Sequence, residues 1–244
     1  MKKALITGAN RSIGFEAARQ LLKKGYHVYL GSRTLKNGQE AAERLKAEGL
    51  TEVEAIELDV SSDESVKAAR AELGKKTGVL DVLINNAGIS GGLPQTTGTD
   101  VSVFKEVFDT NLFGVVRMNQ AFLDLLQRSE EPRIVNVTSG LGSLTLHADP
   151  SWKYYPVKTA VYGPSKAALN LYTIVLAYEL RDTPFKVNVV DPGYTATDFN
   201  NHSGPGTVED AAARLVKCAT IGADGPTGTF FSDDNNPETG ISPW

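Results

Sequence analysis

A tyrosine and a lysine lie four residues apart at the start of a long apolar segment, in the stretch YGPSKAALN. If this stretch is helical, Tyr162 and Lys166 share one face, because residues four positions apart are neighbours on a helix surface. An ammonium group beside a phenol favours the ionised form of the phenol, which eases the transfer of its proton. Such a pair suits hydride transfer to a carbonyl group, whose oxygen gains negative charge and must then be protonated.

The same spacing occurs a second time, in Tyr154 and Lys158. Pro156 lies between these two residues and disfavours a helical conformation for the residue before it. In the later pair, Pro164 falls in a first helical turn, where the N–H group that proline lacks would have no helical partner. The sequence therefore favours Tyr162 over Tyr154 as the reactive tyrosine.

A glycine-containing loop, TGANRSIG at residues 7–14, separates a short apolar run from the helical pattern FEAARQLLKKG. Such a loop can bind a pyrophosphate, because the free N–H groups and the dipole of a helix start favour an anion. Gly8 permits a tight turn, and Gly14 permits close approach of a ribose or of the sheet. Ser12, a good helix-capping residue, occupies a position where many such loops have a third glycine. Alone, the loop is also compatible with an ordinary capped turn.

Two arginines suggest which dinucleotide would bind. Arg33 follows the strand pattern HVYLGS, where an acidic residue would bind a ribose 2′-hydroxyl and an arginine accommodates a 2′-phosphate. Arg11, in the first loop, adds a second positive charge. These residues predict NADP(H) rather than NAD(H), unless Arg33 simply faces solvent. After the next strand pattern, Asp59 and Val60 are placed to meet an adenine edge, although Asp59 could equally cap the following helix.

The elements that must position these residues alternate along the chain. Seven β-rich runs are visible: KKALIT, HVYLGS, VEAIEL, VLDVLIN, RIVNVTS, KVNVVD and GTFFS. Helical stretches lie between them, the first closed by Gly25 and another opened by a predicted capping box at Ser61 and Glu64. This alternation predicts one domain over residues 1–244, a Rossmann-type, doubly wound and mostly parallel seven-stranded sheet with helices on both faces. Ligands bind such sheets beyond the carboxyl ends of the strands.

Composition narrows the class of protein. Of the 244 residues, 41% are hydrophobic, and the net charge of −4 gives no electrostatic footprint for nucleic acid. No apolar stretch approaches the roughly 18 residues of a membrane span. Cys218 is the only cysteine, which excludes an internal disulfide, and the three histidines are too scattered to indicate a metal site. We therefore expect a cytoplasmic protein with no metal, no membrane association and no nucleic-acid partner.

Taken in order, the motifs resemble those of the short-chain dehydrogenase/reductase family, and within it the NADPH-dependent carbonyl reductases. The resemblance runs from residue 3 to about residue 232 and depends on TGANRSIG, Asn85-Asn86-Ala87-Gly88, Asn111, Ser139, Tyr162-x-x-Ser165-Lys166 and Pro192-Gly193. It implies that Tyr162 is the acid and base, and that Lys166 holds the nicotinamide ribose and lowers the tyrosine pKa. It also implies that Ser139 positions the substrate oxygen and that Asn111 anchors a water molecule in the proton relay.

The loops after the strand runs supply the predicted cofactor contacts. They include the segment after Pro192-Gly193, which the resemblance places against the nicotinamide carboxamide, together with the residues discussed above. The full set is Gly8, Asn10, Arg11, Ser12, Ile13, Gly14, Arg33, Asp59, Val60, Asn86, Ala87, Gly88, Tyr162, Lys166, Pro192, Gly193, Thr195 and Thr197. Asn111 lies in a helical run interrupted by Gly114, where a local kink would free a carbonyl group for the relay water.

Two departures from the family pattern carry expectations of their own. Ser12 replaces the usual middle glycine. We expect this change to alter the geometry of the phosphate contacts but not to prevent the loop from binding a dinucleotide. The interval from Ser139 to Tyr162 is about ten residues longer than is common in the family, so that residues 145–158 form an inserted loop beside the active site. The tail, residues 233–244, is polar and rich in turns, and we expect Trp244 to be a loose end.

Apolar and aromatic residues gather in the loops after the fifth and sixth strand runs. They indicate an apolar or aromatic carbonyl substrate, although several could pack the core instead: Leu141, Trp152, Tyr155, Tyr194 and Phe199. The predicted reaction is NADPH-dependent reduction of a ketone or aldehyde with Tyr162 as general acid. An alcohol dehydrogenase acting oxidatively and a non-catalytic NADP(H)-binding sensor remain alternatives. Homodimers and tetramers are common in the family, but the inserted loop could obstruct the surface through which its members pair, so that a monomer stays an alternative.

Overall fold

Seven strands form one sheet in the computed structural model, which describes residues 1–92 and 94–244. Their order is β3-β2-β1-β4-β5-β6-β7, and every neighbouring pair is parallel. The strands are β1 (Lys3–Ile6), β2 (His27–Ser32), β3 (Val53–Glu57), β4 (Val82–Asn85), β5 (Arg133–Val137), β6 (Lys186–Val190) and β7 (Phe230–Phe231). Each predicted β-rich run contains one strand, and the predicted doubly wound α/β domain is confirmed.

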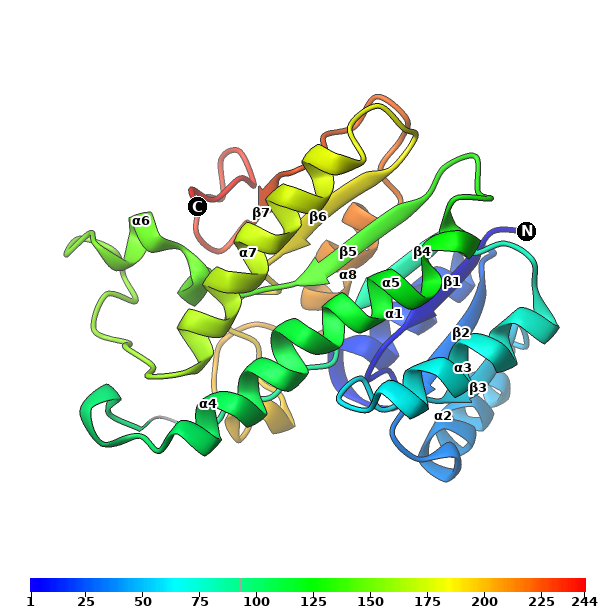
Figure 1. Cartoon of the computed structure of the whole chain (residues 1–244), viewed down its shortest axis with the longest axis horizontal. Helices are drawn as coiled ribbons and strands as arrows, with labels where there is room; N and C mark the ends of the chain where they lie inside the picture. Colours follow the sequence, from blue (N-terminus) through cyan, green and yellow to red (C-terminus); the bar gives the residue numbers. More distant parts are fainter. Residues whose placement is uncertain (93) are drawn as a thin grey trace.

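Helices cover both faces of this sheet (Figure 1). They are α1 (Ser12–Lys23), α2 (Leu35–Ala47), α3 (Asp63–Lys76), α4 (Val101–Phe108), α5 (Gly114–Leu126), α6 (Leu144–His147), α7 (Tyr162–Glu179) and α8 (Val208–Ala219). Successive strand residues point to opposite faces. Ile6 accordingly packs in a core with α1, α2 and α8, whereas Leu5 packs in a second core with α3, α5 and α7. Burial of aliphatic side chains on both faces stabilises the sheet and fixes the strand ends.

Local signals set the helix boundaries. Gly25 follows α1 in the left-handed conformation, with φ of 80°, as its glycine stop predicts. The predicted capping box at Ser61 is wrong by one residue. Ser62 caps α3 by accepting a hydrogen bond from the Ser65 N–H, because the N–H and hydroxyl of Ser61 both donate to Asp59 Oδ1.

The winding of the sheet reverses between β1 and β4, which lie side by side. From β1 the sheet extends through β2 to β3, and from β4 it extends through β5 and β6 to β7. Ligands of doubly wound sheets bind at such a switch point, beyond the carboxyl ends of the strands. The loops that follow β1, β4, β5 and β6 carry most of the predicted site residues to this edge.

The end of the chain is held in place by the segment before α7. The ring of Trp244 lies 5.5 Å from that of Phe230, between centroids, and its carbonyl oxygen accepts a hydrogen bond of 3.0 Å from the Thr145 N–H. The Pro243 carbonyl oxygen accepts another from the Ser143 hydroxyl, at 2.8 Å. The expectation that Trp244 is a loose end is therefore wrong, because these contacts join the tail to the beginning of the inserted loop.

Candidate active site

Three side chains meet beyond the carboxyl end of β5. Tyr162 is the first residue of α7, and Lys166 lies one turn further, with its ammonium nitrogen 5.7 Å from the centre of the tyrosine ring. Ser139 follows β5 and lies close enough to Tyr162 for its side chain to lower the pKa of the phenol. The helical start at Tyr162, with Pro164 in the first turn, thus places a phenol, an ammonium group and a hydroxyl within one small site.

Burial shifts the proton affinities of these groups. It raises the pKa of Tyr162 above the ordinary value; the Asp191 carboxylate adds to the rise, and the hydrogen bond with Ser139 opposes it. Burial lowers the pKa of Lys166 to about 8, while its ammonium group donates to the Val137 carbonyl oxygen at 2.8 Å. Without further positive charge nearby, the phenol therefore holds its proton at neutral pH and is an acid rather than a base.

Asn111 lies in a π-helical turn, η2 (Asp109–Phe113), between α4 and α5. Such turns interrupt the regular hydrogen-bond ladder of a helix, as the predicted kink requires. The side chain of Asn111 is fully used: Oδ1 accepts from the Ile89 N–H, and Nδ2 donates to the Ile89 carbonyl oxygen and to Ser165 Oγ. A Cβ added to Gly88 would lie 3.3 Å from Asn111 Oδ1 and 3.6 Å from Lys166 Nζ. The loop after β4 thus passes close to Asn111, the predicted relay residue, and to Lys166, which was predicted to hold the nicotinamide ribose.

The loops after β1 and β4 are joined by hydrogen bonds. The Thr7 hydroxyl accepts from the N–H groups of Asn86 and Ala87, at 3.0 and 2.9 Å. In return, Asn86 Nδ2 donates to the carbonyl oxygens of Thr7 and Gly8. These contacts fix the predicted cofactor loops relative to each other at the switch point.

Gly14 and Ser12 differ from the sequence expectation. A Cβ at Gly14 would lie 2.6 Å from Asn86 Nδ2 and 2.7 Å from the Gly8 carbonyl oxygen, so this glycine permits loop-to-loop contact. Ser12 does not cap α1: Arg11 is the capping position and its side chain makes no capping bond. Ser12 instead has a left-handed backbone, with φ of 54°, which is the conformation that favours glycine. The helix start keeps its free N–H groups, flanked by the half-buried Asn10 and Ile13.

The two predicted phosphate-binding arginines have different surroundings. Arg33 is exposed beside the N-terminus of α2 and forms no ion pair within the part of the chain that the structure describes. Arg11 is exposed as well, but its guanidinium group lies 3.2 Å from Asp198 Oδ2 in the loop after β6. Asp59 uses Oδ1 to shape the turn before α3, which favours its structural role. Val60 packs against Gly114, where an added Cβ would approach it to 2.9 Å.

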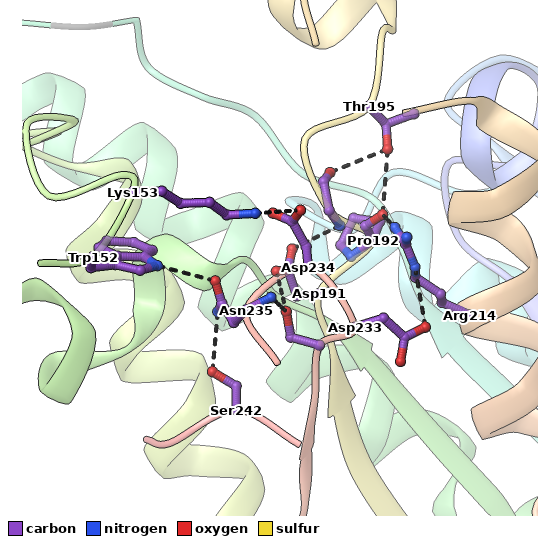
Figure 2. Close-up of polar contacts among 12 residues, drawn as sticks. Trp152, Lys153, Asp191, Pro192, Thr195, Arg214, Asp233, Asp234, Asn235 and Ser242 are labelled. Carbon is purple, nitrogen blue, oxygen red and sulfur yellow. Dashed lines mark hydrogen bonds and ion pairs between the residues drawn. The ribbon is translucent and has the colours of Figure 1, made fainter. Parts of the chain in front are cut away.

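The loop after β6 is held by its own polar groups. Gly193 has a left-handed backbone, with φ of 81°, and its N–H donates to Asp191 Oδ1 at 2.9 Å. The buried Thr195 hydroxyl donates to the carbonyl oxygens of Pro192 and Gly193 (Figure 2). Thr197, also buried, caps the short helix η4 (Asp198–Asn200). The predicted nicotinamide-facing segment is therefore ordered by contacts within itself.

The predicted substrate residues divide into two groups. Phe199 lies close to Tyr162, with ring centroids 5.3 Å apart, and Leu141 follows Ser139 in the turn η3 (Gly140–Gly142). Tyr194 is 44% exposed and stacks edge-on against Tyr154 of the inserted loop. These three remain candidates for substrate contact.

Trp152 and Tyr155 have other surroundings. Trp152 is buried, and its indole N–H donates to Asn235 Oδ1 of the tail at 3.3 Å (Figure 2). This contact joins the inserted loop, residues 145–158, to the tail, residues 233–244, and we call these two segments the wall of the site. Tyr155 is half-buried and carries the Lys158 ammonium group over its ring, 4.0 Å from the centroid. Neither observation brings these two side chains to Tyr162.

The second tyrosine–lysine pair is not assembled. Tyr154 lies in a turn and Lys158 in an irregular segment, so the pair is not on a helix. Lys158 donates to the His147 carbonyl oxygen at 2.9 Å. Tyr154 instead has the Lys153 ammonium group 4.8 Å from its ring centroid, and burial and the nearby Asp234 of the tail raise the pKa of its phenol. This tyrosine belongs to the wall of the site, a role that spacing alone did not indicate.

A buried carboxylate near Tyr162 escaped the sequence analysis. Asp191 directly follows β6 and is 4% exposed, and its Oδ2 accepts from the Ser232 hydroxyl at 2.7 Å. The available signal was an acidic residue that closes the apolar run KVNVVD directly before Pro192-Gly193. Asn235, which joins the tail to Trp152, gave no signal, because its partners lie far away in the chain.

Comparison with known proteins agrees with this geometry. Residues 2–207 match the short chain dehydrogenase family. The chain is 34% identical to (+)-neomenthol dehydrogenase of Capsicum annuum, over 93% of this chain and 94% of that protein. It is also 34% identical to (−)-isopiperitenone reductase of Mentha piperita, over 95% of this chain and 96% of that protein. The structure of an NADPH-bound carbonyl reductase from chicken fatty liver superposes with a TM-score of 0.85 at 25% identity, covering 100% of this chain and 99% of that one.

The chain therefore belongs to the short chain dehydrogenase family. Members of this family are oxidoreductases that bind a nicotinamide cofactor and act on small molecules. Along the residues that the structure describes, no helix combines the length and apolar character that crossing a membrane requires.

Proposed function

We propose that this protein reduces a ketone or an aldehyde to an alcohol with NADPH, and that Tyr162 donates the proton. The observation that carries the proposal is the meeting of Tyr162, Lys166 and Ser139 beyond the end of β5, with the Lys166 ammonium nitrogen 5.7 Å from the centre of the tyrosine ring and burial keeping the phenol protonated. A protonated phenol can bind the carbonyl oxygen and release its proton as negative charge develops there. Bound NADPH would supply the hydride.

Ser139 and Lys166 support this proton transfer. The Ser139 hydroxyl can donate a second hydrogen bond to the substrate oxygen, where charge develops in the transition state. Its position is fixed by the Leu141 N–H, which donates to it at 3.2 Å. Lys166, with a pKa lowered to about 8, carries a positive charge at neutral pH that stabilises the tyrosinate left behind.

The residues at the switch point fit a dinucleotide with a 2′-phosphate. The start of α1 has free N–H groups and no capping side chain, and so could receive a pyrophosphate. Gly88 leaves open the space beside Asn111 and Lys166 that a Cβ would enter. Arg33, exposed after β2, would bind the 2′-phosphate, with Arg11 as a weaker contributor because Asp198 already pairs with it.

The side chains near Tyr162 indicate the substrate class. The ring of Phe199 lies beside that of Tyr162, and Leu141 and Tyr194 lie in the loops after β5 and β6. A compact apolar or aromatic carbonyl compound would suit such surroundings. The related neomenthol dehydrogenase and isopiperitenone reductase are named for cyclic terpenoid alcohols and ketones. We infer that cyclic, largely apolar ketones are the first compounds to test.

The test is the loss of nicotinamide absorbance with NADPH or NADH over cyclic terpenoid ketones, aryl ketones, aldehydes and keto esters. NADPH-dependent turnover of at least one apolar carbonyl compound is expected. Preference for NADH would contradict the role of Arg33. Tight NADPH binding without turnover in either direction would favour the sensor, and turnover only of alcohols with NADP⁺ would favour the oxidative alternative.

A further inference from the structure

Three aspartates surround the loop after β6, and only two of them are paired with a cation (Figure 2). Asp233 lies 3.4 Å from the Arg214 guanidinium group, and Asp234 lies 2.8 Å from the Lys153 ammonium group. Asp191 is buried between them and makes no ion pair with any residue that the structure describes. A buried carboxylate without a cation is costly, so its retention calls for a physical explanation.

Burial raises the pKa of Asp191, and its hydrogen bonds oppose this rise because they stabilise the ionised carboxylate. The Gly193 N–H donates to Oδ1 at 2.9 Å, and the Ser232 hydroxyl donates to Oδ2 at 2.7 Å. Ser232 Oγ already accepts from the Asn235 N–H at 3.1 Å, which directs its own proton toward Asp191. Each carboxylate oxygen thus receives one donor, and such bonds favour the charged form.

Asp191 lies against the turn that carries Ser139. Its Oδ2 is 3.2 Å from the position that a Cβ on Gly140 would take, and Gly140 directly follows Ser139, which lies near Tyr162. The titratable groups that face Asp191 come from three elements: Tyr162 of α7, Arg214 of α8 and Asp234 of the tail. Arg214 is directed to the Pro192 carbonyl oxygen and to Asp233, so it leaves the charge of Asp191 unpaired.

We propose that the Asp191 carboxylate is a positioning residue that holds the proton on Tyr162 and thereby sets the pH range of the reaction. This inference rests on the proposed function of Tyr162 as the acid. A fixed negative charge near the phenol disfavours the phenolate, because like charges repel most strongly where water is excluded. The Asp191 charge therefore keeps the phenol of Tyr162 protonated up to a higher pH. A protonated phenol suits carbonyl reduction, which needs a proton donor, more than alcohol oxidation. The direction agrees with the rise in the Tyr162 pKa to which Asp191 contributes.

The test compares wild type with Asp191→Asn, which keeps the shape of the side chain and removes its charge. Both directions of the reaction are measured across pH with NADP(H). The midpoint of each profile should move to lower pH by about 1 unit in the variant. Ser232→Ala removes the hydroxyl that donates to Asp191 and so makes the ionised carboxylate less favourable. The midpoint should move in the same direction in this variant, but by a smaller amount. Asp233→Asn, which removes a neighbouring carboxylate that is already paired, should leave it unchanged.

Lower turnover with an unchanged midpoint in Asp191→Asn would show a merely structural role and overturn the inference. If Asp191→Asn does not fold, an unchanged midpoint in Ser232→Ala overturns it. A measurement that does not depend on turnover tests the effect of Asp191 on Tyr162 even if the proposed reductase function is wrong. The titration of Tyr162 with NADP⁺ present is followed by ¹³C NMR of tyrosine-labelled protein, with Tyr162→Phe to assign the signal. A common midpoint, or no titration in either protein below about pH 11, also overturns the inference.

Discussion

The proposed cofactor side and the proposed substrate side of the site are built in different ways, although both join segments that are distant in the chain. On the cofactor side, Thr7, Gly8 and Asn86 join the loops after β1 and β4 through main-chain groups and short side chains. On the substrate side, the inserted loop and the tail are joined by single side-chain contacts such as that of Trp152 with Asn235, which are 83 residues apart in the chain. The first set of contacts connects two strand-end motifs, whereas the second connects residues that belong to no motif. The two sides should therefore respond differently to substitution.

The largest effect is expected from Gly14→Ala on the cofactor side. The new Cβ would lie 2.6 Å from Asn86 Nδ2 in the loop after β4 and 2.7 Å from the Gly8 carbonyl oxygen in its own loop, so the two loops must move apart. We expect a loss of about 1–3 kcal/mol in the free energy of unfolding and a roughly hundredfold weaker NADPH affinity. Denaturant unfolding and NADPH fluorescence titration measure the two. Gly222→Ala, where an added Cβ meets nothing within 4 Å, is the control and should change neither.

Arg33→Ala should separate the two cofactors without affecting the fold. Loss of an exposed guanidinium group that binds a 2′-phosphate should weaken NADPH binding by about tenfold to thirtyfold and leave NADH binding unchanged. Arg11→Ala should have a smaller effect, because Asp198 already pairs with Arg11. Lys46→Ala, at the opposite end of α2, is the charge-matched control. An equal loss for both cofactors would mean that Arg33 does not read the 2′-phosphate.

The sequence predicted the cofactor side better than the substrate side. Tyr162 and Lys166 are one helical turn apart, and Thr7 to Gly14 form one continuous segment, so the spacing itself determines their geometry. The seven strands were likewise visible as seven apolar runs. By contrast, nothing in the spacing showed that Asn235 would reach Trp152, or that the Trp244 carbonyl would bond Thr145.

Ser12 marks the limit of what a local motif can tell. The sequence shows that a glycine is missing, but it does not show that the backbone keeps the left-handed conformation of that glycine. Asp191 shows the complementary limit, because its burial and its Ser232 partner depend on how β6 and the tail come together. Positions that repeat a local pattern were predictable, whereas those defined by the meeting of distant segments were not.

Asn235→Ala tests whether the substrate side can be disturbed alone. The variant loses the acceptor of the Trp152 indole N–H and the donor to Ser242 Oγ, which loosens the wall behind the inserted loop. We expect the KM for the carbonyl substrate to rise about tenfold, while the Kd for NADPH changes by less than about twofold. Asn37→Ala, on the exposed face of α2, is the matched control. A parallel loss of NADPH affinity would show that the two sides are not separable.

The smallest effect is expected from Ser12→Gly. Glycine adopts the left-handed backbone of this position without steric cost, which stabilises the folded state, whereas its greater freedom stabilises the unfolded chain. We expect the first effect to be larger, so that the free energy of unfolding rises by about 0.5 kcal/mol. NADPH affinity should stay within about tenfold of wild type. Thermal unfolding and NADPH titration measure both quantities. A larger loss of affinity would mean that the Ser12 hydroxyl binds the phosphate directly.

The most direct test of the account is the comparison of Tyr162→Phe with Tyr154→Phe, measured as kcat for NADPH-dependent reduction alongside NADPH affinity. Tyr162→Phe should lose about a thousandfold in kcat and keep its NADPH affinity, because it removes only the proton donor. Tyr154→Phe should retain kcat within about threefold, since this residue belongs to the wall. Near-normal turnover in Tyr162→Phe, with loss in Tyr154→Phe, would contradict the assignment of Tyr162 as the acid.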